Sequence, residues 1–307
     1  MHFTDLEIFD AHCDLPGRLY DGADPKDPGL HFSLVSAKKY ARYIQSMAFC
    51  IIDKRREHPF SVTLQGIESL RMSFPDLPLI TSKSSLLEHR QGTALLLAVE
   101  GGEAIEGSLD FLRVLFQKGV RLMTLTWNNI NEIADAAAER KIPGGLTSFG
   151  REVVKEMERL GMAVDVSHIS EKGFWDVLDV AEKPVIASHS CAMQLCTHPR
   201  NLTDSQFEAL CKNGGIVGVN FYPVFLGDTT IDSILRHFCH FLSLGGENHI
   251  GFGSDFDGIS QLPQGISGAS DFDKIINALL RENISEEIVR KIAYKNLENY
   301  FLKVLPG

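Results

Sequence analysis

Short apolar runs recur along the whole chain, each bounded by glycine, proline or polar residues. Eight of these runs are rich in Val, Ile, Leu and Phe and have the length of buried strands. They cover residues 6–9, 47–52, 94–99, 120–125, 162–166, 185–187, 216–221 and 250–252. Between most of them lie longer stretches in which apolar residues recur with the period of a helix. The pattern therefore predicts strands that alternate with helices.

Helix-boundary residues occur where the helical stretches begin and end. Thr203, with Gln206 three residues later, is typical of a capping box, in which each side chain accepts from the backbone N–H of the other residue. Ser285 precedes two glutamates, whose charge suits a helix N-terminus. Gly119 and Gly161 follow helical runs and mark their ends. These signals support the alternation that the apolar pattern predicts.

The positions of ionisable residues favour a closed barrel over an open sheet. Eight buried strands alternating with helices predict a parallel sheet, which can close or stay open. A barrel gathers the carboxyl ends of all its strands around one site, whereas an open sheet has its site at one switch point. Ionisable residues follow strands along the whole chain, namely Asp10, His12, Asp14, Glu100, His168, His189 and Asp255. We therefore expect an α/β fold, a single (β/α)8 TIM-type barrel domain spanning residues 1–307.

The charge and cysteine content exclude several classes of partner. Lys and Arg number 30 against 40 Asp and Glu, a net charge of −10, which does not suit nucleic acid or an anionic membrane surface. No apolar run is long enough to span a bilayer, and the first residues lack the pattern of a signal peptide. The six cysteines have no framework spacing, so free thiols in a reducing compartment are expected. We predict a cytoplasmic protein, with a homodimer left open.

Three histidines and two carboxylates at predicted strand ends are candidate metal ligands. His12 and Asp14 are two residues apart, so in an extended chain both side chains point to the same face. His168 and His189 each follow an apolar run, where an imidazole is either a structural residue or a ligand. Glu100 directly follows the five apolar residues LLLAV, and at this position an unpaired carboxylate would be costly to bury. This set suits two zinc ions per chain, with Glu100 between them.

Other polar residues could serve catalysis or substrate binding. Asp255 ends the eighth strand and could move a proton, with Asp257 as the alternative. Arg200 follows the sixth strand and its planar guanidinium suits a carboxylate, although a surface role is common for arginine. His237 and His240 occupy a helical stretch and are expected to pack or face solvent. The sequence contains no nucleophile elbow, which makes nucleophilic catalysis a poor alternative.

The ordered motifs of the chain resemble those of the renal (membrane) dipeptidases, a metallopeptidase branch of the amidohydrolase superfamily. The resemblance covers about residues 8–301 and rests on DAHCDLP, VEGGEAI, GVRLMTLT, DVSHIS, VIASHS, the Arg200–Asn201 pair, GVNFY and GFGSDFDG. It implies that His12 and Asp14 hold one zinc ion and that His168 and His189 hold the other. Glu100 would bridge the two ions.

The same resemblance implies roles for three further residues. Arg200 matches the arginine that binds the C-terminal carboxylate of the substrate, Asp255 the catalytic acid and base, and Tyr222 a residue near the substrate. The implied reaction is zinc-dependent hydrolysis of dipeptides by a hydroxide that bridges two metal ions. The alternatives are another binuclear amidohydrolase, acting on an N-acyl amino acid, ester or lactone, and a noncatalytic barrel that binds a metal or peptide. The fourth predicted strand holds no lysine that could be carbamylated, which favours the dipeptidase branch.

One position departs from the family pattern. After GVRLMTLT the mammalian members carry a histidine, and this chain has Trp127 followed by Asn128. We expect Trp127 to form a wall of the substrate pocket, because an indole cannot relay a proton. Asn128 or Asn131 would then donate a hydrogen bond to the reacting oxygen. The mammalian members are secreted and lipid-anchored, and because neither signal is found in this sequence, we expect a bacterial-type cytoplasmic form.

Overall fold

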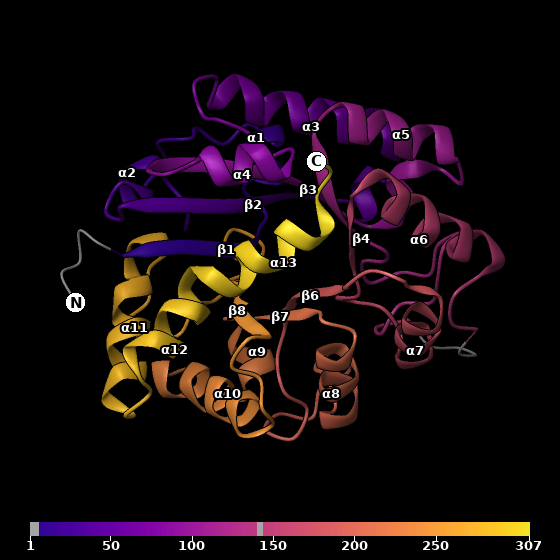
Figure 1. The fold of residues 1–307 in the computed structure, drawn as a ribbon. Coiled ribbons are helices and arrows are strands. Elements are labelled where there is room, and N and C mark those ends of the chain that lie inside the picture. The colour runs from indigo at the N-terminus through magenta and orange to yellow at the C-terminus, as the bar shows by residue number, and fades with distance from the viewer. Residues whose placement is uncertain (1–5, 140–143) are drawn as a thin grey trace.

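A closed barrel of eight parallel strands forms the centre of the protein (Figure 1). The computed structural model describes residues 6–139 and 144–307, so the first five residues of the predicted domain and residues 140–143 lie outside the description. Each strand pairs with the next along the chain, and the eighth pairs with the first. The strands are β1 (Glu7–Cys13), β2 (Arg42–Cys50), β3 (Gly92–Glu100), β4 (Val120–Thr124), β5 (Ala163–Asp165), β6 (Ile186–Ser190), β7 (Ile216–Val219) and β8 (Ile250–Phe252). The predicted barrel is confirmed.

The first two strands are longer than the apolar pattern predicts. Strand β2 begins at Arg42, and Gln45 lies within it, yet all nine residues of the strand are buried. Arg42 Nη2 lies 2.7 Å from Glu298 Oε1, and Gln45 donates to Asp10 Oδ2 over 2.9 Å. A buried polar side chain with a partner costs little, so polar residues can occupy a barrel strand. The pattern of apolar residues could not reveal those pairings.

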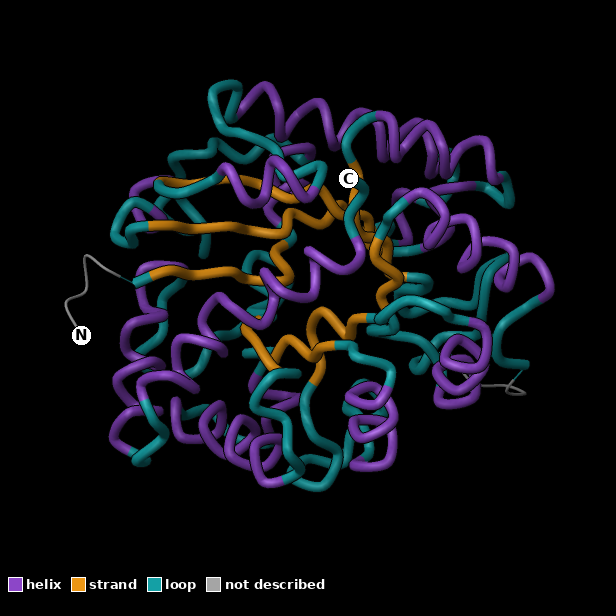
Figure 2. The backbone as a smooth tube through the Cα atoms, viewed as in Figure 1, coloured by secondary structure: helices purple, strands orange, loops and turns teal. Residues whose placement is uncertain are grey.

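Helices surround the barrel on the outside (Figures 1 and 2). The α-helices are α1 (Leu15–Tyr20), α2 (Leu34–Ala37), α3 (Pro59–Ser73), α4 (Lys83–Glu88), α5 (Leu109–Gln117), α6 (Ser148–Leu160), α7 (Glu171–Val180), α8 (Asp204–Lys212), α9 (Pro223–Leu226), α10 (Ile231–Ser243), α11 (Phe272–Arg281), α12 (Glu286–Arg290) and α13 (Asn296–Val304). The predicted capping box at Thr203 opens α8, Ser285 caps α12, and Gly161 ends α6.

Two apolar clusters make up the core. The larger lies between the barrel and its helices, and the smaller fills the barrel interior together with α13. In the smaller cluster the ring of Phe9 from β1 stacks on Phe301 of α13, with centroids 5.2 Å apart. Phe9 lies in the first half of its strand, so α13 closes the amino-terminal end of the barrel, as Figure 2 shows. The polar residues lie at the opposite, carboxyl-terminal end of the barrel.

Two glycines allow three strands to approach closely below the polar end. A Cβ atom on Gly218 of β7, or on Gly253 after β8, would lie 2.0 Å from the carbonyl oxygen of Ser188 on β6. No other residue type fits at these positions without displacing backbone. The close approach fixes the backbone next to His189.

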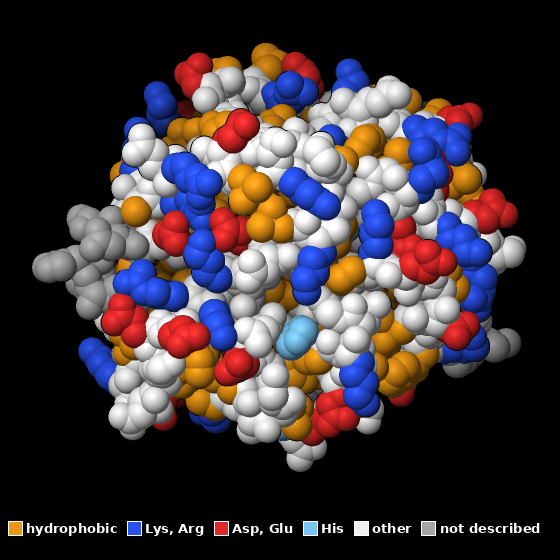
Figure 3. Space-filling view, in the orientation of Figure 1, with side chains coloured by type: hydrophobic (Ala, Val, Ile, Leu, Met, Phe, Trp, Pro, Cys, Tyr) orange, Lys and Arg blue, Asp and Glu red, His pale blue; other side chains and the backbone are white. Residues whose placement is uncertain are grey.

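The outer surface carries charges of both signs. Lys and Arg side chains alternate with Asp and Glu over the face in Figure 3, and apolar side chains are scattered among them. No helix of the described part of the chain has the length and apolar character needed to cross a bilayer. The six cysteines are free, as expected.

Candidate metal centre

The five predicted ligands converge at the carboxyl end of the barrel. Their positions are His12 within β1, Asp14 directly after β1, Glu100 at the end of β3, His168 after β5 and His189 within β6. All five are buried. Strand ends that are far apart in the sequence meet here because the barrel is closed.

Glu100 lies between the other four side chains. Its Oε1 atom is 2.9 Å from His168 Nε2 and 3.1 Å from His189 Nε2. Its Oε2 atom is 3.7 Å from His12 Nε2, which in turn is 3.3 Å from Asp14 Oδ2. One carboxylate oxygen thus faces one pair of predicted ligands and the second oxygen faces the other pair. A carboxylate in this position can bind two cations at once.

Hydrogen bonds orient two of the imidazoles. Nδ1 of His168 lies 3.1 Å from Asn128 Oδ1, and Nδ1 of His189 lies 2.8 Å from Ser188 Oγ. The Ser188 hydroxyl donates to Asp165 Oδ2 over 2.6 Å, so its oxygen is free to accept from His189. An imidazole that donates from Nδ1 has its lone pair on Nε2. Both lone pairs therefore point toward Glu100, as metal ligation requires.

Burial keeps these two imidazoles neutral. Burial and the charge of Arg200 lower the pKa of His168 to about 4. Burial and the charge of His12 hold the pKa of His189 well below its usual range. A neutral imidazole is the form that ligates a metal.

The other half of the cluster attracts positive charge. Burial opposes a charge on His12, but Glu100 and Asp14 outweigh it and raise the pKa of His12. His12 Nε2 and Asp14 Oδ1 are buried without a hydrogen-bond partner in the described structure. Unpaired buried nitrogen and oxygen atoms that face a shared carboxylate fit a divalent cation. The two halves of the cluster have the donor set of two such sites.

Asp255 lies beside the His12 half of the cluster. It follows β8 in a left-handed conformation, with φ 63°, and its Oδ2 accepts from Asn220 Nδ2 over 2.8 Å. One atom each of His12, Asp14 and Asp255 lie within 4.8 Å of one another. Burial raises the pKa of Asp255 well above its usual range, with Asp14 among the charges that add to the shift. A carboxyl group that holds its proton readily can act as acid and base.

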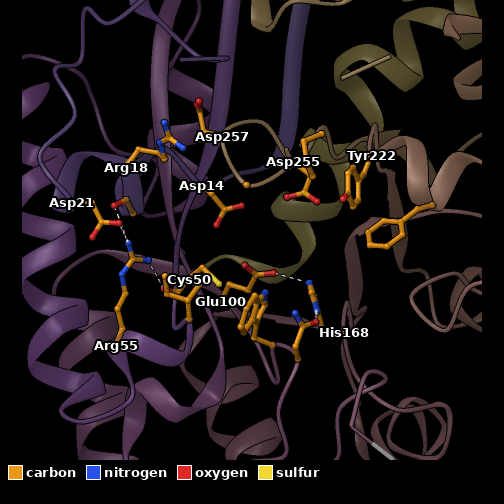
Figure 4. A pocket seen from close by; sticks show the side chains of 17 residues that line it. Asp14, Arg18, Asp21, Cys50, Arg55, Glu100, His168, Tyr222, Asp255 and Asp257 are labelled. Atoms are coloured by element: carbon orange, nitrogen blue, oxygen red, sulfur yellow. Dashed lines mark hydrogen bonds and ion pairs between the residues drawn. The ribbon is translucent and has the colours of Figure 1, made fainter. Parts of the chain in front are cut away.

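Asp257, the alternative to Asp255, has a structural role instead. Its two carboxylate oxygens accept from the backbone N–H groups of His31 and Phe32, over 2.8 and 3.1 Å. In Figure 4 it lies apart from Asp14 and Glu100. Its hydrogen bonds hold the loop before α2 against the barrel, so although Asp257 also borders the main cavity, the geometry favours Asp255 as the catalytic carboxylate.

A cavity of about 370 Å³ opens above the cluster. Its wall contains Trp127, Asn128 and Tyr222, together with Asp14, Glu100, His168 and Asp255 (Figure 4). The indole centroid of Trp127 lies 6.5 Å from the ring of His168, and Tyr222 packs edge-on against Phe225. Three of the predicted substrate contacts are therefore next to the predicted metal ligands.

Arg200 is buried beside the cluster rather than placed on the surface. It is 5% exposed and lines a smaller cavity that also borders His168, rather than the wall of the main cavity. Its Nη2 donates to the carbonyl oxygen of His189 over 3.1 Å, and its guanidinium lies 5.5 Å from the ring of Phe225. Its Nε is buried without a partner in the part of the chain that the structure describes. The guanidinium thus retains hydrogen-bonding capacity beside the histidine half of the cluster.

Asn131, the alternative to Asn128, already has hydrogen-bond partners within the protein. Its amide group donates to Glu103 Oε2 and to the carbonyl of Leu125, over 3.1 and 2.9 Å. Its oxygen accepts from the N–H groups of Ile133 and Ala134. These hydrogen bonds join Asn131 to Glu103 after β3 and to the loop after β4, so the geometry favours Asn128 as the donor to substrate.

The two histidines expected to have structural roles do so. His237 is buried in α10, where its Nδ1 accepts from the N–H of Ala192 and its Nε2 lies 3.2 Å from the carbonyl of Leu226. His240 pairs with Asp204 at 2.7 Å on the outside of the barrel. Neither approaches the metal ligands.

Several residues of the site were not singled out from the sequence. Asp165 and Ser188 orient His189, Asn220 holds Asp255, and Cys50 lines the cavity. Asp165 and Ser188 stand in the same short motifs as the predicted ligands, DVSH and ASH, which was the signal available. Cys50 lies in no motif that contains a predicted ligand, so the sequence did not single it out.

The fold and the cluster together define a closed barrel with a candidate metal centre at the carboxyl ends of its strands. The chain belongs to the membrane dipeptidase family, peptidase family M19, which it matches over residues 3–306. The family expected from the motifs is confirmed.

Proteins of known sequence and structure agree with this assignment. An uncharacterized dipeptidase of Schizosaccharomyces pombe is 41% identical over 215 residues, 66% of this chain and 51% of the relative. The chain thus spans about half the length of that relative. An uncharacterized protein from the pqqA 5' region of Klebsiella pneumoniae is 35% identical over 216 residues, 66% of this chain and 79% of the relative.

Two solved structures superpose over nearly the whole chain. A dipeptidase of metallopeptidase family M19 has a TM-score of 0.90 at 26% identity, over 98% of this chain and 99% of the other. A metallopeptidase of Rhodobacter sphaeroides, liganded with a phosphinate mimic of the dipeptide L-Ala-D-Ala, has a TM-score of 0.86 at 25% identity, over 98% and 99%.

Proposed function

We propose that the protein is a dipeptidase that binds two zinc ions per chain. The observation that carries this proposal is the position of Glu100, with one oxygen toward His168 and His189 and the other toward His12. His12 and Asp14 would hold one ion, His168 and His189 the second, and Glu100 both. The membership of family M19 supports a metal-dependent reaction on a dipeptide.

The chemistry divides between the ions and the side chains. Two zinc ions held by these residues would lower the pKa of a bound water to about 7 and would polarise the carbonyl of the scissile bond. Asp255 would take the proton of the attacking water and give it to the leaving amine. Its place within 4.8 Å of His12 and Asp14 atoms supports this role, as does the raised pKa of its buried carboxyl.

The cavity wall would hold the dipeptide. The volume of the cavity, about 370 Å³, is in the range of small-molecule sites. Trp127 and Tyr222 would cover the substrate, and Asn128 would donate from its amide nitrogen to the reacting oxygen. Arg200 would bind the C-terminal carboxylate with its unused N–H groups, which requires the substrate to reach past His168 into the smaller cavity.

A dipeptide panel with zinc restored after chelation tests the proposal. The protein should be inactive when stripped, and two zinc ions per chain should restore hydrolysis of free dipeptides. Preferential turnover of N-acyl amino acids, esters or lactones would instead indicate another binuclear amidohydrolase. A chain that holds both ions and cleaves none of these compounds would be a binding protein.

A further inference from the structure

Cys50 stands directly beside the carboxylate that the proposed metal centre shares. It is the last residue of β2, and in the barrel register its Cα is paired with that of Glu100 on β3. Paired residues on neighbouring strands point to the same side of a sheet. Cys50 is 6% exposed and lines the cavity, and Figure 4 shows its sulfur next to the Glu100 carboxylate.

The sulfur belongs to a second group of possible ligand atoms. One atom each of Asp14, Cys50 and Glu100 lie within 4.8 Å of one another. Ligand atoms around one tetrahedral zinc ion are about 3.3–3.8 Å apart, given metal–ligand distances of about 2.0–2.3 Å. A small closure of the side chains would therefore bring all three to one cation. Asp14 Oδ1 is buried and has no hydrogen-bond partner in the described residues, so this oxygen is available as a metal ligand.

The remaining buried cysteines differ from Cys50 in their surroundings. The Cys13 thiol points to Asp257 at 3.6 Å, and the Cys191 thiol donates to the carbonyl of Asn220 over 3.3 Å. Neither is part of a cluster of possible metal ligands in the described residues. Cys50 alone among these three combines burial, the cavity wall and two carboxylates.

We propose that Cys50 is a ligand for a thiophilic divalent cation, zinc or cadmium, together with Asp14 and Glu100. The inference rests on the proposed metal centre and adds a soft donor to a set that is otherwise nitrogen and oxygen. On binding, the thiol releases its proton to solvent and a sulfur lone pair forms the metal–sulfur bond, with no change of oxidation state. Thiolate donors select zinc and cadmium over manganese or magnesium.

Cadmium titration of the metal-free chain tests the inference. A cadmium–thiolate bond gives an ultraviolet charge-transfer band, which the wild-type protein should develop with an amplitude of one thiolate per chain. Cys50→Ser should abolish the band and weaken cadmium binding by about tenfold or more, with less than about a threefold effect on manganese. Cys191→Ser, a substitution of another buried cysteine, should keep the band.

A measurement on the wild-type protein alone tests the inference if Cys50→Ser does not fold. The ¹¹³Cd resonance of the wild-type protein should lie downfield, where sulfur-ligated cadmium appears. A wild-type protein that binds cadmium without the band and without the downfield shift would overturn the inference, as would a band that persists in Cys50→Ser. The proposed function fails by a different result, namely loaded zinc protein that hydrolyses no dipeptide.

Discussion

Asn128 Oδ1 lies 3.1 Å from Nδ1 of His168, so the first residue after Trp127 fixes the orientation of a predicted metal ligand. The sequence suggested only that Asn128 contacts substrate. The amide can do both, because its oxygen faces the imidazole and its nitrogen remains to donate into the cavity.

Two substitutions at Asn128 separate the two roles. Asn128→Asp retains an acceptor for His168 and lacks the donor, so it should keep its metal and lose about a hundredfold in kcat. Asn128→Ala lacks both and should also lose metal affinity by about tenfold or more. Metal content and kcat, measured on the same samples, check the split. If the aspartate variant keeps full kcat, Asn128 serves only to orient His168.

Removal of the Glu100 charge should affect both ions. Because each oxygen of Glu100 faces a different half of the cluster, Glu100→Gln should lose both zinc ions rather than one. Glu103→Gln is a matched control, since Glu103 is also buried but accepts from Asn131 in the loop. Elemental analysis after dialysis checks the prediction. Full metal retention in Glu100→Gln would remove the shared carboxylate from the proposal.

Arg200 should matter for the free carboxylate of the substrate. A lysine ammonium replaces a planar guanidinium poorly, so Arg200→Lys should lower kcat/KM on free dipeptides by at least about tenfold, or about 1.4 kcal/mol. An amide-capped dipeptide lacks the partner group, and its turnover should be low in wild type and change little in the variant. Equal turnover of capped and free dipeptides by the wild-type enzyme would contradict the assignment.

Trp127 is expected to shape the pocket without taking part in proton transfer. Trp127→Phe keeps an apolar ring near His168 and should retain most of kcat while the preference among dipeptides changes. Trp127→Ala opens the wall and should raise KM more than it lowers kcat. A drop of about a hundredfold in kcat for Trp127→Phe, with both metals present, would give the indole N–H a direct catalytic role.

The buried His237 should make stability depend on pH away from the active site. Burial lowers its pKa to about 4, so the unfolded chain, in which histidine has a pKa of about 6.5, takes up the proton first. Folding stability is therefore full above pH 6.5 and is lost as the pH falls toward 4, by about 2 kcal/mol at pH 5. His237→Gln retains an acceptor for Ala192 without titrating, and its stability should fall less over that range. Denaturant unfolding of both proteins at pH 7 and pH 5 gives the comparison.

The barrel and the candidate metal ligands could be predicted from the sequence because most strands carry a local signal. Apolar runs marked the eight strands, and an imidazole or carboxylate at the end of such a run is conspicuous. What the sequence could not reveal depends on pairing between distant segments. Gln45 lies outside the predicted strand over 47–52, and its place in β2 depends on its hydrogen bond to Asp10. Asn128 and Asn131 were equivalent in the sequence, and only the structure shows that Asn131 already has partners within the protein whereas Asn128 faces His168.

The barrel closes at the seam where β1 pairs with β8, and this seam also determines when the site can form during synthesis. Ser254 donates to Asp10 across this seam, and the N–H of Asp14 donates to the carbonyl of Phe256. His12 is therefore synthesised well before β8, the strand that completes its surroundings. At ribosomal rates of about 5–20 residues per second, the two edges of the seam emerge on the order of ten seconds or more apart. During that interval the candidate centre is incomplete, so we expect a metal ion to bind only after β8 has paired with β1.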